Sequence, residues 1–299
     1  MRLLAGHNLA AKGRILLGYR MRGVPPFSPL SLFSSGEQGA WYDPSDLSTM
    51  FTDTAGATPA TVGDPVALLL DKSQGLEVGP ELVTNGDFSD GATGWSLGAN
   101  TTISDGVASF NYTGFAGMLT AVGASVVAER FYRISFDLLS RSSGSIRPVL
   151  GNTTISTNTS LGTKTFSYVR PAASLTSGLS FIGSGNGFVG SITNVSVREL
   201  LGNHATQATA AARPTLTAGT PSFLRSDLVD DAILWTASAG TDYTIARLNS
   251  AGVVTILTEQ SLSGSTDIFL EQDIAAYIAV NRALTEGETS GLTAYLEAL

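Results

Sequence analysis

The sequence has no cysteine among its 299 residues and only two histidines, His7 and His204. The lack of cysteine excludes disulfide bonds, cysteine-ligated zinc and thiol catalysis. Two histidines leave almost no scope for a histidine metal site or a Ser-His-Asp triad. The sequence also lacks an apolar run of about 18 residues, so no segment is predicted to span a membrane. These absences favour a binding or structural protein over an enzyme.

Charged residues are scarce as well, at 14% of the chain, well below the quarter that is usual in globular domains. The polar surface must therefore come mainly from Ser, Thr, Asn and Gly. Together with 33 glycines and 11 prolines, this composition is typical of short strands joined by many turns. It predicts a mainly β protein.

The net charge of −8 is unevenly distributed, because residues 1–36 contain five basic and no acidic residues and leave −13 for the remainder. The basic residues are scattered among Leu, Ile and Gly without interleaved aromatic residues, which does not favour a nucleic acid partner. We expect an extended arm that anchors the chain to another protein through Arg2, Lys12, Arg14, Arg20 and Arg22. The three prolines within residues 24–29 cannot continue a helix and predict a linker.

Residues 81–200 contain repeated β patterns separated by turn residues, over 102–104, 107–112, 131–139, 145–150, 164–169, 178–182 and 190–198. Apolar and polar residues alternate from Tyr132 to Leu138, which is the period of a strand with one solvent-facing side. These features predict a β sandwich with Trp95 in its core. The glycines of GNGFVG at 185–190 match a dinucleotide motif by letter, but a strand follows them, so we expect a hairpin loop.

The flanking regions predict a second, smaller β domain. Residues 43–46 resemble a turn that leads into a short helix, and residues 66–70 resemble a buried strand. Further β patterns occupy 232–237, 243–248, 253–257 and 267–270. Thr285 and Glu288 have capping-box spacing ahead of a helix whose apolar face should pack on this domain. We therefore expect four regions: an arm and linker at 1–36, a structural segment at 37–80, the sandwich at 81–200, and a β-rich domain with a C-terminal helix at 201–299.

The segment ELVTNGDF at 81–88, followed by Gly94 and Trp95, resembles the opening of family 4/9/22-type carbohydrate-binding modules. The resemblance implies a jelly roll that binds glycans. A sugar ring needs a flat apolar face and polar groups for its hydroxyls. Candidate glycan contacts are Tyr112, Phe115, Arg141 and Arg147. The alternatives are core packing for the two rings and a solvated loop for the two arginines.

Many modules of this family also hold a structural calcium ion, for which Asp87 is the candidate ligand, because hard oxygen ligands suit that ion. This chain departs from the family pattern in its closing strand, where Thr193 and Asn194 stand in place of acidic residues. An ordinary turn role for Asp87 is the alternative. No other cofactor is expected.

A second resemblance covers the flanks. GEQGAWYDPSDLSTMFTD with GDPVALLLDKS, and GNHATQATAAARPTL, resemble a recurrent segment of tailed-phage and prophage structural proteins. In those proteins the two halves run almost directly into one another before a concanavalin-like sandwich, and the C-terminal NRALTEGETSGLTAYLEAL matches their terminal helix. The resemblance implies that residues 74–200 are an insertion. It also implies a place on the phage particle surface, other virion proteins as partners, and a homo-oligomer, for which we expect a trimer.

The sequence therefore predicts a non-enzymatic virion structural protein, anchored by its N-terminal arm, that displays the jelly roll for attachment to host-surface polysaccharide. Repeated display would raise the avidity of a weak sugar contact. The alternative is a purely architectural capsid decoration or collar protein. A polysaccharide-degrading spike would need a suitably spaced carboxylate pair, whereas the acidic cluster Asp227, Asp230 and Asp231 resembles a structural hairpin. For the lone His204 we expect a turn-forming hydrogen bond.

Overall fold

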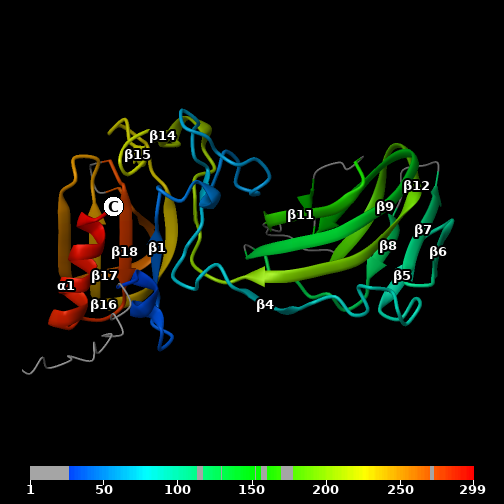
Figure 1. Cartoon of the computed structure of the whole chain (residues 1–299), viewed down its shortest axis with the longest axis horizontal. Coiled ribbons are helices and arrows are strands. Elements are labelled where there is room, and N and C mark those ends of the chain that lie inside the picture. The colour runs from blue at the N-terminus through cyan, green and yellow to red at the C-terminus, as the bar shows by residue number, and fades with distance from the viewer. Residues whose placement is uncertain are drawn as a thin grey trace, which may run out of the picture.

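The computed structural model describes residues 27–112, 117–128, 130–151, 153–155, 160–169, 178–269 and 273–299. Two β bodies lie side by side along the long axis of the molecule (Figure 1). Strands dominate, and the one α-helix of the described residues lies at the C-terminal end. The expected mainly β fold class with a C-terminal helix is thus confirmed. None of the described helices is long and apolar enough to cross a membrane.

The first body, called the frame here, comprises residues 27–77 and 201–299. Its main sheet is antiparallel, with the order β1-β18-β16-β13-β3-β2 and with β17 also paired to β16. A separate hairpin pairs β14 with β15. The strands are β1 (Gly39–Tyr42), β2 (Met50–Phe51), β3 (Leu68–Leu69), β13 (Ala205–Thr206), β14 (Thr215–Thr217), β15 (Phe223–Arg225), β16 (Leu234–Leu248), β17 (Val254–Asp267) and β18 (Ala276–Val280).

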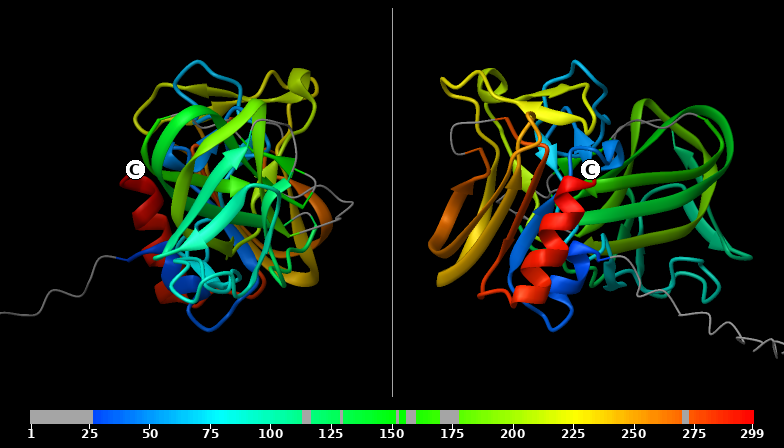
Figure 2. Two further views of the ribbon diagram at one scale, coloured as in Figure 1. Left: turned by 90° about the vertical axis from the view of Figure 1, so that its right-hand side faces the viewer. Right: turned by 60° about the vertical axis from the view of Figure 1, so that its left-hand side comes forward.

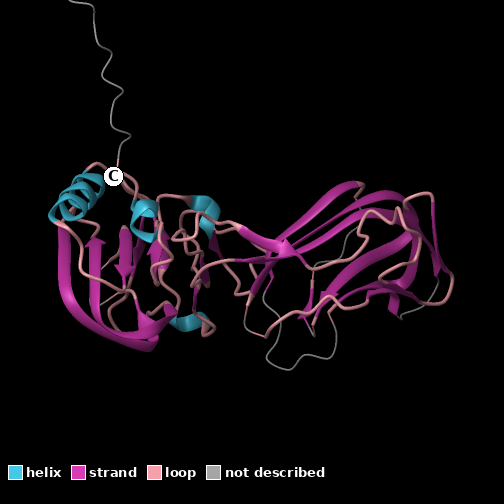
Figure 3. Ribbon diagram, turned by 90° about the horizontal axis from the view of Figure 1, so that it is seen from below, coloured by secondary structure: helices cyan, strands magenta, loops and turns pink. Residues whose placement is uncertain are grey.

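Both faces of the frame sheet are covered, because strand residues alternate between two apolar clusters. Tyr243 and Ile245 of β16 point into one cluster and Ala246 and Leu248 into the other. The second cluster is closed by α1 (Glu286–Glu297), which lies along the sheet in Figure 2 and contributes the buried Leu292 and Leu296. The shorter helices η1 (Pro29–Phe33), η2 (Leu47–Thr49) and η3 (Ala210–Ala212) are 3₁₀ turns, also in the frame (Figure 3).

The C-terminal helix begins as the sequence predicts. The Thr285 side chain accepts a hydrogen bond from the Glu288 backbone N–H, and the Glu288 carboxylate accepts one from the Thr285 N–H, which completes the capping box. Arg282 also pairs with Glu288 at 2.7 Å. The hydrogen bond from Arg282 is the main cause that lowers the pKa of Glu288 to about 2.

The arm and linker expected for residues 1–36 need a correction at their C-terminal end. Residues 1–26, with the five basic residues proposed as anchors, lie outside the described residues. Residues 29–33, however, form η1, and Leu32 and Phe33 are buried in the cluster beneath α1. This part of the chain is therefore a component of the frame core. Proline is compatible with the first turn of a helix, where its missing N–H costs nothing.

The second body, called the inserted unit here, comprises residues 78–200 and forms one nine-stranded antiparallel sheet that folds over its own core. Its central strands follow the order β10-β9-β12-β7-β6. The strands are β4 (Val78–Glu81), β5 (Trp95–Leu97), β6 (Thr101–Ser104), β7 (Val107–Tyr112), β8 (Gly117–Ala121), β9 (Phe131–Leu150), β10 (Thr153–Thr154), β11 (Gly162–Val169) and β12 (Leu179–Leu200). The jelly-roll topology stays a prediction.

Two turns expected in this unit do not exist. The expected break between the patterns at 131–139 and 145–150 lies inside β9, and the expected hairpin loop GNGFVG at 185–190 lies inside β12, so each long strand replaces two predicted short ones. The glycines allow close backbone approach instead of a chain reversal. A Cβ atom on Gly144 would lie 1.9 Å from the Gly187 carbonyl oxygen. The register also shifts between Ser184 and Phe188, as expected at a bulge.

The core of the inserted unit follows the predicted alternation. Ile134, Phe136 and Leu138 of β9 are buried, whereas the intervening residues are partly exposed. Trp95 is 6% exposed and lies against Phe88, with 5.1 Å between ring centroids. Its indole N–H donates to the Asn85 carbonyl at 2.9 Å, which satisfies the polar end of the ring. The expected core position of Trp95 is confirmed.

The charged side chain of Arg247 is buried in the frame interior among mainly apolar residues. Arg247 of β16 is 4% exposed, and its Nε and Nη1 make no hydrogen bond to any part of the chain that the structure describes. It lies opposite Tyr277 of β18. Burial raises the pKa of Tyr277 to about 12, and the Tyr277 hydroxyl also lacks a partner among the described residues. A buried guanidinium without a compensating acid destabilises the fold.

We expect Arg247→Met to stabilise the protein. The methionine retains an apolar stem of similar length and removes the unpaired charge, which should raise the free energy of unfolding by about 1–3 kcal/mol. Urea denaturation monitored by circular dichroism measures this change. The matched control is Arg225→Met at a side chain that is 60% exposed, for which about 0.5 kcal/mol or less is expected. A clear loss of stability in Arg247→Met alone would contradict this account.

Candidate functional site

The inserted unit leaves and rejoins the frame at one place, where the buried carboxylate of Asp71 binds three separate segments. Its Oδ1 accepts hydrogen bonds from the backbone N–H groups of Trp41 and Ser73, both at 2.8 Å. Its Oδ2 accepts from the Ser73 hydroxyl and the Asn203 backbone N–H, both at 2.7 Å. These four hydrogen bonds, called the Asp71 clamp here, connect β1 to the chain before and after the inserted unit.

The clamp requires close packing around Asp71, and the burial of a charged carboxylate costs free energy. Asp71 is fully buried, and this burial raises the pKa of its carboxyl, while the four hydrogen bonds act in the opposite direction. Gly202 has a φ of +131°, and a Cβ atom added there would lie 3.0 Å from Asp71 Oδ2, which is closer than an ordinary van der Waals contact. Glycine is therefore favoured at this position, where the chain re-enters the frame.

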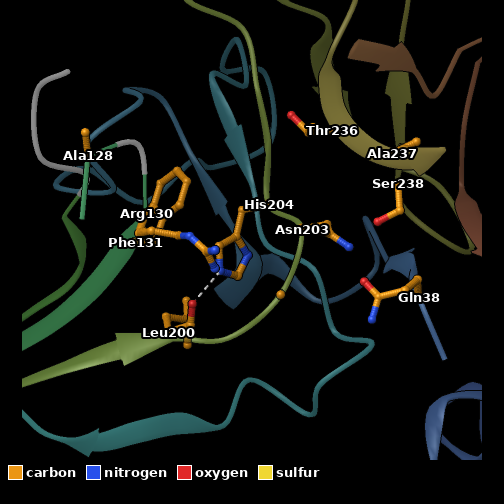
Figure 4. A pocket seen from close by; sticks show the side chains of 11 residues that line it. Gln38, Ala128, Arg130, Phe131, Leu200, Asn203, His204, Thr236, Ala237 and Ser238 are labelled. Atoms are coloured by element: carbon orange, nitrogen blue, oxygen red, sulfur yellow. Dashed lines mark hydrogen bonds between the residues drawn. The ribbon is translucent and has the colours of Figure 1, made fainter. Parts of the chain in front are cut away.

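His204 extends the same junction. Its Nδ1 accepts a hydrogen bond from the Asp71 backbone N–H at 3.0 Å, so the proton of the neutral ring is assigned to Nε2, which faces the Leu200 carbonyl at 3.4 Å (Figure 4). Phe131 packs edge-to-face on the ring, with 4.9 Å between centroids. Burial lowers the pKa of His204 to about 4. The ring therefore makes a local contact with Leu200 and, in addition, a hydrogen bond to a residue 133 positions away, which the expected turn role did not include.

An ion network borders the clamp. Lys72 Nζ lies 2.9 Å from both Asp43 Oδ2 and Asp46 Oδ2, and 4.8 Å from the centroid of the Trp41 ring. Burial lowers the pKa of Lys72, but the bonds to the two carboxylates outweigh it and leave that pKa raised. Asp46 also caps η2 by accepting from the Ser48 N–H. The turn predicted at 43–46 therefore supplies both partners of Lys72.

A cleft of about 460 Å³ opens between the frame and the inserted unit beside the clamp (Figure 4). Both bodies contribute to it. Its lining consists of Gln38, Ala128, Arg130, Phe131, Leu200, Gly202, Asn203, His204, Thr236, Ala237 and Ser238. Arg130 is mostly exposed and pairs with Glu199 at 3.0 Å, so the positive charge at the rim has a partner. The other described residues of the lining are uncharged, because His204 is neutral.

The candidate glycan contacts that the structure describes lie elsewhere. Tyr112 is half-buried against the core of the inserted unit, and Phe115 is outside the described residues. Arg141 is exposed and its Nε donates to the Gly144 carbonyl at 2.6 Å, whereas Arg147 is half-buried opposite Ile182. Both arginines belong to β9 and not to a loop. None of the three described residues, Tyr112, Arg141 and Arg147, lines the cleft.

Asp87 forms a turn and not a cluster of acidic ligands. Its Oδ1 accepts from the Ser89 N–H and hydroxyl, and these bonds lower the pKa of the carboxyl. Within the described ranges, the one group of three or more metal-type ligands is Asp227, Asp230 and Asp231. There, Asp227 Oδ1 accepts from the backbone N–H groups of the next residues, beginning with Val229 at 2.9 Å. The described surroundings of Asp87 therefore do not fit a carboxylate-rich calcium site.

Sequence reasoning did not identify the residues that line the cleft. Arg130 and Ser238 come from distant parts of the chain and belong to none of the motifs named above, and Gln38 lies in the segment GEQGAW with no role predicted for it. The second resemblance gave the one signal, because it covers the GEQ segment with Gln38 and the GNH segment with Gly202, Asn203 and His204. A scan against models of known protein families gives no match to this chain, and a search of curated proteins gives none either.

We expect Asp71→Asn to destabilise the protein by about 2–5 kcal/mol, because an amide nitrogen would face two donors that the carboxylate now satisfies. Chemical denaturation measures the loss. Asp64→Asn is the matched control: Asp64 accepts two bonds from Thr61 at an exposed turn, and we expect about 1 kcal/mol or less. If the two variants lose the same free energy of unfolding, the Asp71 clamp contributes no more to stability than the hydrogen bonds of an exposed turn, which would contradict the prediction.

The pKa of His204 predicts a pH dependence. The unfolded ring protonates near pH 6.5 and the folded ring near pH 4, so the unfolded state binds the extra proton between these values. Stability from this residue is complete above pH 6.5 and decreases toward pH 4, by about 1.4 kcal/mol per pH unit.

His204→Gln keeps an acceptor but does not titrate. The difference in unfolding free energy between wild type and this variant should therefore change with pH in the window from 4 to 6.5 and be constant above it. A difference that is constant across the whole window would refute the assignment of His204 as a neutral, buried ring.

Proposed function

We propose that this chain is a non-enzymatic structural protein of a tailed-phage particle, in which the frame displays the inserted unit for attachment to host-surface glycan. The observation that carries the proposal is the Asp71 clamp, which unites the DKS and GNH segments that resemble adjacent parts of phage structural proteins. With these segments together, residues 78–200 project from the frame as one unit.

The display arrangement has a physical basis. The Leu201 backbone N–H donates to the Glu77 carbonyl at 3.1 Å, so the two ends of the inserted unit are neighbours. An apolar cluster at the neck joins Phe51 and Leu70 of the frame to Phe131 and Leu200 of the inserted unit. Figure 1 shows the inserted unit extending from this neck away from the frame. A fixed neck supports presentation of a binding surface to an external partner.

The junction chemistry supports a binding role over a catalytic one. Both ring nitrogens of His204 face backbone groups, and its pKa of about 4 leaves it neutral at physiological pH. The Asp71 carboxylate oxygens each accept two hydrogen bonds. Groups engaged in this way have no free position for proton transfer to a substrate.

A purely architectural role is the second candidate, and the aromatic residues favour it. In the described part of the inserted unit, Phe88, Trp95, Phe136 and Phe181 are buried, and Tyr112 is half-buried. A stacking platform for sugar is therefore not formed by these rings. The virion location, the trimer and the anchoring role of the arm remain proposals that depend on the resemblance.

We expect the full-length protein to bind host cells and their purified surface polysaccharide, and a variant with residues 78–200 replaced by a short Gly-Ser linker to lose both. The linker is feasible because Glu77 and Leu201 are hydrogen-bonded neighbours. Binding can be measured by biolayer interferometry, with near-UV circular dichroism as the test that the frame stays folded. Absence of binding by the full-length protein would favour the architectural role, and release of oligosaccharides would show an enzyme.

A further inference from the structure

The cleft between the two bodies contains polar groups that no other part of the described chain uses. Thr236 and Ser238 lie on the exposed side of β16, and neither hydroxyl has a hydrogen-bond partner among the described residues. Opposite them, Figure 4 shows the Gln38 and Asn203 amides facing the same space. The nitrogen of each amide donates to a backbone carbonyl, that of Gly36 or Gly39. Their side-chain oxygens accept no hydrogen bond from a described residue.

The character of the lining selects the kind of ligand. Two hydroxyls and two amide oxygens can donate to and accept from a hydroxyl-rich molecule, and none of the described residues that line the space is acidic. The charge of Arg130 is compensated by Glu199, which gives no net preference for an anion. Leu200 and Ala237 add small apolar surfaces. A volume of about 460 Å³ lies within the range of small-molecule sites.

We propose that this cleft binds a short segment of an uncharged glycan. The inference rests on the proposed attachment function and places its ligand site between the two bodies, away from Tyr112 and Arg141. It also gives the Asp71 clamp a role in binding, because a site assembled from Gln38 on the frame and Arg130 on the inserted unit requires a fixed relation between them. A preorganised site loses less entropy when the ligand binds.

The test uses the full-length protein on an array of neutral hexose and N-acetylhexosamine oligosaccharides, with sialylated and sulfated glycans alongside. Ser238→Trp fills the cleft, and Thr102→Trp places the same side chain at an exposed position of β6, at the end of the inserted unit away from the frame (Figure 1). We expect Ser238→Trp to weaken neutral glycan binding by about tenfold or more, as the loss of one or two hydrogen bonds would. Thr102→Trp should bind like wild type.

Two further variants make the result decisive. Gln38→Ala removes one amide without adding bulk and should also weaken binding, which covers the case in which Ser238→Trp fails to fold. Arg141→Ala tests the competing site on β9 and should have no effect. Wild-type binding that survives both cleft variants, or that is confined to charged glycans, overturns the cleft site and leaves the attachment function intact. A wild type that binds no glycan overturns both.

Discussion

The buried carboxylate of Asp71 is the interaction on which the arrangement of the chain depends. A charged group can be buried at this depth only if its oxygens are fully hydrogen-bonded, and the four donors come from Trp41, Ser73 and Asn203. These residues lie on β1, before the inserted unit and after it. The frame sheet depends on the same closure, because β3 and β13 pair across the insertion point.

The inserted unit is held together by a different principle. β9 and β12 pair along most of their length, and together they form the centre of the sheet and the bend in it around Gly144 and Gly190. Glycines at the bend permit backbone contacts that no side chain could accommodate, as at Gly144 and Gly190. The long strands end at the neck, where Phe131 and Leu200 meet the frame. The bend and the neck are thus continuous parts of the same two strands.

The junction and the frame interior differ in whether their buried charged groups have hydrogen-bond partners. Asp71 has a complete set of donors, whereas Arg247 has two N–H groups without acceptors among the described residues. The first arrangement fixes the chain ends of the inserted unit, whereas the second leaves two nitrogens of a buried guanidinium without a partner among the described residues, which we expect to reduce stability. A protein tolerates such a cost when other packing is sufficient, and both faces of the frame sheet are covered.

Local patterns in the sequence were sufficient to predict the mainly β class, the alternation of Ile134, Phe136 and Leu138, the core position of Trp95 and the capping box at Thr285. Each of these depends on neighbours within a few residues, so the chain itself carries the information. The continuity of β9 and β12 could not be predicted, because a glycine in a turn and a glycine in a bulge look the same in sequence. The His204 partnership and the cleft depend on residues more than a hundred positions apart, and only the closed fold brings them together.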